Sequence, residues 1–119
     1  MIISIDWPPS VNHYWERGKN GRMFIGKRGI AFRKSVKLAV MQIIGNSEPL
    51  TCHLSCRIMA YPPDKRRRDI DNILKATLDA LEKSGVYKDD SQIKDLRIIM
   101  NEPVRSGRLE IAIKEIEKC

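Results

Sequence analysis

Two segments with helical periodicity lie between segments with strand periodicity, and this order limits the folds that the chain can adopt. Residues 30–44 and 69–83 each place apolar side chains on one stripe of a helix. Residues 50–60, residues 93–101 and the segment around Ile111 alternate apolar and polar side chains, and residues 2–6 form a short first strand. The order β-α-β-α-β-β predicts an α+β fold, with two main helices packed on a mixed β-sheet.

The predicted elements have defined ends. Trp7-Pro-Pro-Ser10 ends the first strand and Tyr61-Pro-Pro63 ends the strand over residues 50–60, because proline lacks the N–H that a strand ladder needs. Gly45 and Gly85 follow the two helices. The helical stripes are predicted to be Phe32, Val36, Val40 and Ile43, and Ile70, Ile73, Leu74, Leu78 and Leu81. Residues 7–28 are predicted to form a long loop or loose hairpin, basic and aromatic enough to contact a ligand.

Cys52, His53 and Cys56 form a group of potential zinc ligands. They belong, however, to a segment in which apolar and polar side chains alternate from Leu50 to Ile58, as on a strand. Four residues of strand span about 13 Å, too far for two thiolates to bind one zinc ion. We therefore expect Cys52 and Cys56 to be small buried side chains.

The chain has 119 residues, which fits a single domain over residues 1–119. No apolar run approaches the roughly 20 residues of a membrane span, and the first residues lack the basic start of a signal peptide. We therefore expect a cytoplasmic protein with no membrane partner. The net charge of +7 favours a polyanionic partner, nucleic acid first.

The segment Pro63-Asp-Lys-Arg-Arg-Arg-Asp-Ile-Asp-Asn-Ile-Leu-Lys75 carries the strongest chemical signal. It could be a solvated charge run in which aspartates cap a helix and oppose its dipole. That interpretation explains Asp69 but not the adjacent cations, because a helix N-terminus disfavours positive charge. Alternatively, four cations hold phosphates while the carboxylates hold a divalent metal such as Mg²⁺. The four cations are Lys65, Arg66, Arg67 and Arg68.

The spacing sets conditions on such a metal site. Asp69 and Asp71 point about 200° apart in a regular helix, so they converge only if Asp69 lies before the first turn. Lys75 follows Asp71 by four residues and shares its face, either as a surface ion pair or as a cation aimed at a phosphate. A third carboxylate is available from Asp89 or Asp90. These could instead be two solvated loop residues, one of them capping a turn.

Four blocks of the sequence resemble the RusA family of Holliday-junction resolvases, small metal-dependent endonucleases of bacteria, phages and prophages. The resemblance covers most of the chain. It implies a homodimer that binds four-way DNA junctions and makes paired symmetric nicks, with Mg²⁺ or Mn²⁺ as cofactor. The blocks are Trp7-Pro-Pro-Ser-Val-Asn12, Lys65-Arg-Arg-Arg-Asp-Ile-Asp-Asn72 with Lys75, Gly85-Val-Tyr-Lys-Asp-Asp-Ser-Gln92, and Gly107-Arg-Leu-Glu-Ile111.

The resemblance also assigns roles. It implies that Asp69, Asp71 and Asp90 are the catalytic, metal-binding acids and that Lys75 is the catalytic lysine. It gives Asp89 no role. The DNA-binding run comprises Lys65, Arg66, Arg67 and Arg68, although Lys65 stands where the family often has arginine. The stretch from Tyr14 to Arg28 does not align with the family blocks, so no role is carried over to it.

These residues predict phosphodiester hydrolysis, in which Lys75 stabilises charge on the phosphate or on the leaving oxygen. Two other functions fit parts of the sequence. A non-catalytic nucleic-acid-binding module would use the basic run for phosphates and the acids only as helix caps. A metal-dependent phosphoryl or nucleotidyl enzyme for small substrates would use the acids, but it gives no reason for a net charge of +7.

Overall fold

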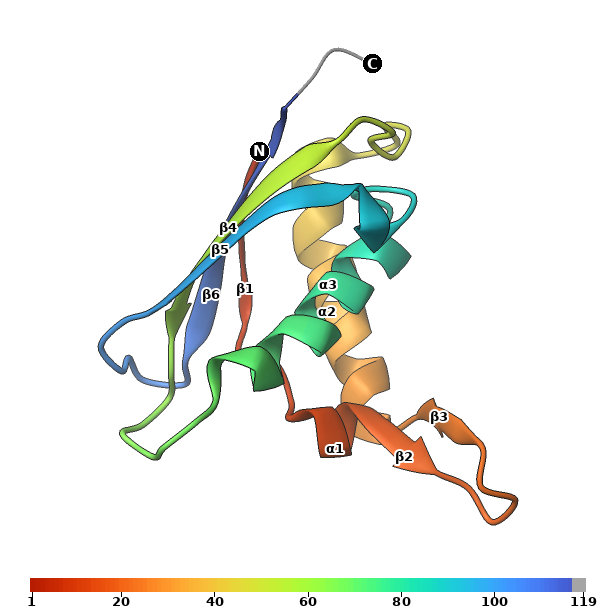
Figure 1. Cartoon of the computed structure of the whole chain (residues 1–119), viewed down its shortest axis with the longest axis vertical. Coiled ribbons are helices and arrows are strands. Elements are labelled where there is room, and N and C mark those ends of the chain that lie inside the picture. The colour runs from red at the N-terminus through yellow and green to blue at the C-terminus, as the bar shows by residue number, and fades with distance from the viewer. Residues whose placement is uncertain (117–119) are drawn as a thin grey trace.

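A four-stranded sheet forms the framework of the computed structural model, which describes residues 1–116 (Figure 1). Its order is β1 (Ile2–Asp6), β6 (Arg108–Glu115), β4 (Leu54–Tyr61) and β5 (Ile93–Met100). Strand β6 is antiparallel to both of its neighbours, whereas β4 and β5 are parallel. A parallel pair requires a crossover connection, and the chain between β4 and β5 supplies it as a helix.

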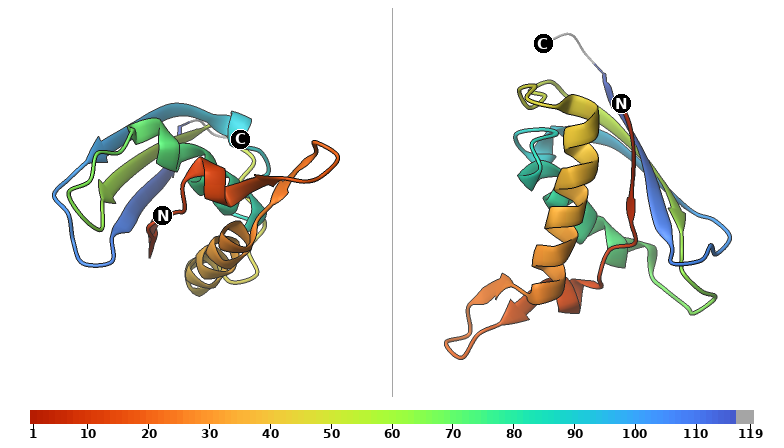
Figure 2. Two further views of the ribbon diagram at one scale, coloured as in Figure 1. Left: turned by 90° about the horizontal axis from the view of Figure 1, so that it is seen from below. Right: turned by 180° about the vertical axis from the view of Figure 1, so that it is seen from behind.

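Two long helical segments cover one face of this sheet (Figure 2). The first is α2 (Lys27–Ile44), and the second joins a 3₁₀ turn, η1 (Ile70–Ile73), to α3 (Leu74–Lys83). Alternate residues of β1, β4 and β6 are buried beneath them, which explains the period-two pattern of these strands, whereas the residues of β5 are exposed or half-buried. The buried strand residues are Ile3, Ile5, Leu54, Cys56, Ile58, Ala60, Leu109, Ile111 and Ile113. The predicted α+β class and the order of the main elements are confirmed.

The predicted helical stripes were partly wrong. Ile43 is 47% exposed, because Ile44 and not Ile43 continues the row of Phe32, Val36 and Val40 that faces the core. Ile70 is 41% exposed because it begins the 3₁₀ turn, whose three residues per turn rotate it away from the core. On α3, the buried face consists mainly of small side chains rather than leucines: Ala76, Thr77, Ala80 and Leu81.

Two other segments differ from the sequence prediction. The strand expected over residues 50–60 begins only at Leu54, while Leu50 forms an isolated parallel bridge with Tyr87. Cys52 and Cys56 are both buried, as predicted. Residues 7–28 contain a short helix, α1 (Val11–Tyr14), which the sequence did not predict.

A hairpin follows α1 and projects from the body of the molecule (Figure 1). It consists of β2 (Trp15–Arg17) and β3 (Met23–Ile25), which pair antiparallel and confirm the expected hairpin. Between residues 1 and 116, no helix combines the length and apolar character needed to cross a membrane.

Candidate active site

The basic run lies in the loop between β4 and η1, and Arg68 is engaged within it. One terminal nitrogen of Arg68 donates to the carbonyl oxygens of Asp64 at 3.1 Å and Arg66 at 3.0 Å. The other lies 2.8 Å from the Asp64 carboxylate, and the guanidinium carbon is 5.7 Å from the Trp7 ring centre. The Arg66 N–H and the Arg68 guanidinium lower the pKa of Asp64. Arg68 therefore stabilises the conformation of the loop between β4 and η1.

Three cations of the run remain available to a ligand. Lys65, Arg66 and Arg67 are exposed, and the side chain of Arg66 is 84% exposed. Arg66 lies 3.5 Å from Asp64, a weak surface ion pair that a phosphate can replace. The run thus presents positive charge to solvent immediately before the two aspartates.

Gly107 brings the blocks around Trp7 and Pro63 together. Its φ is +67°, a conformation that favours glycine. A Cβ atom at this position would lie 2.9 Å from Pro63 Cδ and 3.0 Å from Trp7 Cβ, closer than real Cβ contacts. Because no larger residue fits, the turn before β6 packs directly on the start of the basic loop. The Gly107 block therefore has a structural role in placing this loop.

Asp69 and Asp71 occupy the backbone positions that allow their carboxylates to converge. Asp69 is extended, with φ −79° and ψ 135°, and precedes η1, whereas Asp71 lies in the first turn. The Asp69 side chain makes no capping hydrogen bond, so the interpretation of this residue as a helix cap is wrong. Both side chains are exposed. Asp71 can still oppose the helix dipole from the first turn, but Asp69 forms no side-chain cap.

Lys75 lies in the first turn of α3 and is exposed. No ion pair within 4.0 Å joins it to Asp71 in the part of the chain that the structure describes. The surface ion pair considered from the sequence is therefore absent. The ammonium group is free to approach an anion at the N-terminal end of the helix.

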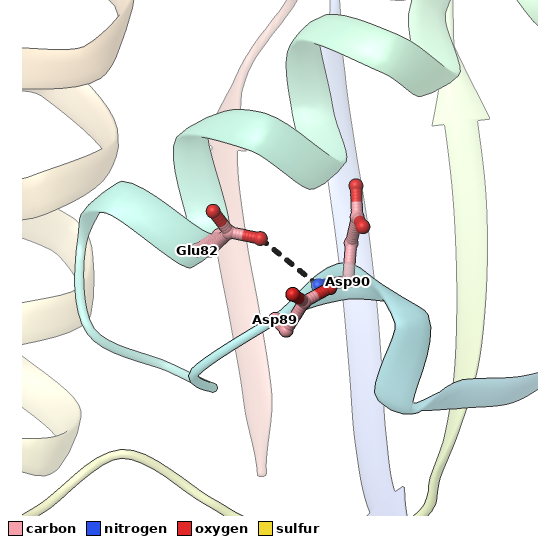
Figure 3. Close-up of side chains that lie close together, drawn as sticks. All are labelled: Glu82, Asp89 and Asp90. Atoms are coloured by element: carbon pink, nitrogen blue, oxygen red, sulfur yellow. Dashed lines mark hydrogen bonds between the residues drawn. The ribbon is translucent and has the colours of Figure 1, made fainter.

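Three carboxylates meet at the other end of α3 (Figure 3). Glu82, Asp89 and Asp90 each offer an oxygen, and these oxygens lie within 4.8 Å of one another. The backbone N–H of Asp90 donates to Glu82 Oε1 at 2.9 Å, which fixes the loop to the helix. Carboxylate oxygens are the ligands that Mg²⁺ prefers, so the donor set fits a hard divalent cation.

The loop that carries Asp89 and Asp90 is fixed by its other residues. Gly85 turns the chain at φ +88°, and the buried Tyr87 donates its hydroxyl hydrogen to the carbonyl of Leu78 at 2.6 Å. Asp89 accepts from the N–H of Ser91 at 2.8 Å and caps η2 (Asp90–Gln92); that N–H lowers the pKa of Asp89. Asp89 thus caps a turn, the structural alternative considered from the sequence.

The three aspartates expected to form the metal site do not meet within one chain. Among residues 1–116, the acidic group around Asp90 includes neither Asp69 nor Asp71. These two precede α3, whereas Glu82 and Asp90 lie at its C-terminal end. A helix of 10 residues is about 15 Å long at 1.5 Å per residue. Asp69 and Asp71 therefore lie before the start of α3, whereas Asp90 lies beside its last turn.

A partly buried polar network joins the helices α1, α2 and α3. The Tyr14 hydroxyl donates to the Asp79 carboxylate, and Arg33 Nε donates to the Tyr14 oxygen at 2.8 Å. Arg33 also contacts Asp79 at 2.6 Å. Burial raises the pKa of Tyr14, so its hydroxyl remains a donor. This network ties α1 and α2 to α3, which carries Lys75.

Sequence reasoning missed three of these residues. Glu82 was assigned no role from the sequence, because its proximity to Asp90 depends on the turn at Gly85. Tyr14 and Arg33 gave no local signal, because Tyr14 is 65 residues from Asp79 and Arg33 is 46 residues from it. No periodicity within a window of the sequence connects such positions.

Comparison with known proteins identifies the family. The family model for endodeoxyribonuclease RusA matches residues 6–114. The crossover junction endodeoxyribonuclease of Enterobacteria phage 82 is 39% identical over 117 residues, 96% of this chain and 93% of the relative. The protein of that name from Escherichia coli K12 is 38% identical over the same shares, and that of phage HK97 is 40% identical over 95% and 92%. The chain belongs to the RusA family of endodeoxyribonucleases.

Proposed function

We propose that this protein is a divalent-metal-dependent endodeoxyribonuclease that resolves four-way DNA junctions by paired symmetric nicks. The main support is that the chain aligns with crossover junction endodeoxyribonucleases along 92–93% of their length. The exposed cations before Asp69, the exposed carboxylates and the net charge of +7 all suit a DNA substrate. Mg²⁺ is the proposed cofactor, and Mn²⁺ can replace it.

The proposed chemistry follows from the residue types. Asp69, Asp71 and Asp90 would hold the metal through carboxylate oxygens. When bound, the metal supplies an activated water and neutralises charge on the scissile phosphate. Lys75 donates to the phosphate and stabilises the charge that develops there. Lys65, Arg66 and Arg67 bind phosphates on either side of the cut and hold the strand in register.

The separation of the aspartates supports an active site shared by two chains. In a homodimer with two-fold symmetry, two antiparallel α3 helices bring the N-terminal end of one beside the C-terminal end of the other. Asp69 and Asp71 of one protomer would then share a metal ion with Asp90 of its partner. Such a dimer has two equivalent sites, which matches the two opposing strands that a junction resolvase must cut.

The separation also favours a second candidate, a junction-binding protein that does not cleave. Incubation of a synthetic four-way junction with Mg²⁺ distinguishes the two, with the linear duplex of one arm as control. We expect nicks at symmetric positions in two opposing strands of the junction, loss of nicking in EDTA and no cleavage of the duplex. Tight junction binding without nicks, in Mg²⁺ and in Mn²⁺, would identify the binding module instead.

A further inference from the structure

A pocket of about 300 Å³ opens between α1, the β2–β3 hairpin and the start of α3. This volume is at the lower end of the roughly 300–1,000 Å³ of small-ligand sites, so the pocket suits a single ring rather than a larger group. It joins the block Trp7–Asn12 and the hairpin, neither of which has a role in the proposed chemistry, to Lys75. The lining residues are Val11, Asn12, Trp15, Met23 and Lys75.

The chemistry of the lining suits an uncharged ring attached to an anion. Val11, Trp15 and Met23 supply apolar and aromatic surface. The Asn12 amide supplies both a hydrogen-bond donor and an acceptor, and Lys75 supplies the single charge among the residues that line the pocket. An amide can form two hydrogen bonds with the edge of a nucleobase, and an indole can stack on the face of the base.

The pocket walls are held firmly in the structure. Tyr14, between Asn12 and Trp15, is fully buried and bonded to Arg33 and Asp79. The Tyr14 and Trp15 rings meet edge to face with centroids 5.2 Å apart. Because Asp79 lies one turn beyond Lys75 on α3, the same network fixes both sides of the pocket. A ligand would therefore enter a site that is already formed.

We propose that this pocket receives one nucleobase of the strand being cut, while Lys75 contacts the phosphate beside it. The proposal rests on the proposed function and extends it, because it makes Asn12 and Trp15 residues that choose the cut position. A base inside duplex DNA must leave its stack to enter, and that costs least where pairing is already disturbed. The centre of a four-way junction offers such bases, whereas an intact duplex does not.

The first test replaces single nucleotides near the cut by abasic sites and measures binding in metal-free buffer, where no cleavage occurs. Stacking of a base on Trp15 quenches tryptophan emission. At one position beside the cut, the abasic site should abolish part of the quenching and weaken binding by about 5- to 100-fold. Trp15→Phe should remove the dependence of emission on that position. Equal quenching by the intact junction and by all abasic junctions overturns the proposal.

The second test measures cleavage of junctions that carry each of the four bases at the position identified. Asn12→Ala should bring the four rates within a factor of about two, whereas the wild type should separate them by about 5- to 100-fold. Asn46→Ala changes an exposed asparagine outside the pocket and should retain the wild-type preference. An unchanged preference in Asn12→Ala overturns the assignment.

The hairpin provides a matched pair of variants. Met23 and Phe24 are adjacent in β3 and 56% and 49% exposed, but only Met23 lines the pocket. Met23→Ala should weaken binding of the intact junction and have no effect on binding of the abasic junction. Phe24→Ala should change the affinity for the two junctions by the same factor. Equal effects of the two variants overturn the pocket. If the wild type neither binds nor cuts junctions, both the proposed function and the nucleobase pocket are wrong. If it cuts junctions at the same rate whatever the base, only the nucleobase pocket is wrong.

Discussion

Asp90 is bonded through its backbone N–H to Glu82 at 2.9 Å, so the third expected aspartate lies at the C-terminal end of α3. Asp71 lies in the 3₁₀ turn before the same helix. This relationship means that a single chain does not place the three aspartates around one ion. The proposed metal-dependent function therefore requires either a second protomer or a different set of ligands, and the predictions below separate these possibilities.

The carboxylates should be needed for cleavage but not for binding. Asp69→Asn, Asp71→Asn and Asp90→Asn should each reduce Mg²⁺-dependent junction cleavage at least 100-fold, the order of loss for one essential group. Junction affinity in EDTA should be retained or rise, because a negative charge near phosphate is removed. Asp95→Asn, an exposed aspartate on β5, is the matched control and should cut normally. A normal rate for any of the three variants would remove that residue from the site.

Arg67 and Arg68 should behave differently despite being neighbours. Arg67→Ala should lower the slope of log K against log salt concentration by about 0.9, the effect of losing one phosphate contact. Arg68 is bonded to Asp64 and packs on Trp7, so Arg68→Ala should lower the urea midpoint of unfolding and change the salt slope less. Binding titrations between low and high salt measure the slopes. Equal slopes for Arg67→Ala and wild type would show that Arg67 does not contact DNA.

Lys75 should act on the reaction more than on binding. Lys75→Ala should lower the single-turnover rate on saturated junction by about 100-fold or more, because a charge beside the phosphate is lost. Affinity should fall much less, since one lysine is a small share of the phosphate contacts. Lys75→Arg retains the charge but not its shape and should restore the rate in part. A near-normal rate for Lys75→Ala would rule out the catalytic role.

Tyr14 should make stability sensitive to alkaline pH. Burial raises the pKa of Tyr14 in the folded state above its ordinary value of 10.0. Above pH 10 the unfolded chain therefore loses a proton that the folded chain keeps, and stability falls as pH rises. Each such tyrosine contributes at most about 1.4 kcal/mol per pH unit. Urea unfolding between pH 8 and 11 should show a shallower fall for Tyr14→Phe than for wild type, and parallel curves would contradict the prediction.

The sequence predicted most of the main elements because β1, β4, β6 and the two long helices each bury one face. Ile3 and Ile5, and the apolar positions of β4 and β6, alternate as strand residues must. The order β1-β6-β4-β5 could not be predicted, because strand pairing depends on contacts between distant segments. Ile43 was predicted to be buried because helical spacing allows either i+3 or i+4, and only packing selected Ile44.

The sequence likewise indicated only some features of the candidate site. Local spacing set the condition that Asp69 lie before the first turn, which the structure meets. It could not show that Arg68 turns back to Asp64, because that bond depends on the loop conformation. It also could not show that Asp90 meets Glu82, because eight residues and a glycine turn separate them.

Mixing two inactive variants tests the shared active site most directly. Asp71→Asn and Asp90→Asn are co-expressed, and the mixed dimer is incubated with Mg²⁺ and a supercoiled plasmid that extrudes a cruciform junction. If Asp71 of one protomer works with Asp90 of its partner, the mixed dimer retains one intact site and should produce nicked circles. The pair Asp69→Asn and Asp71→Asn should restore no nicking, since every site then lacks an aspartate. A mixture of Asp71→Asn and Asp90→Asn as inactive as either variant alone, beside an active wild type, would contradict the shared site.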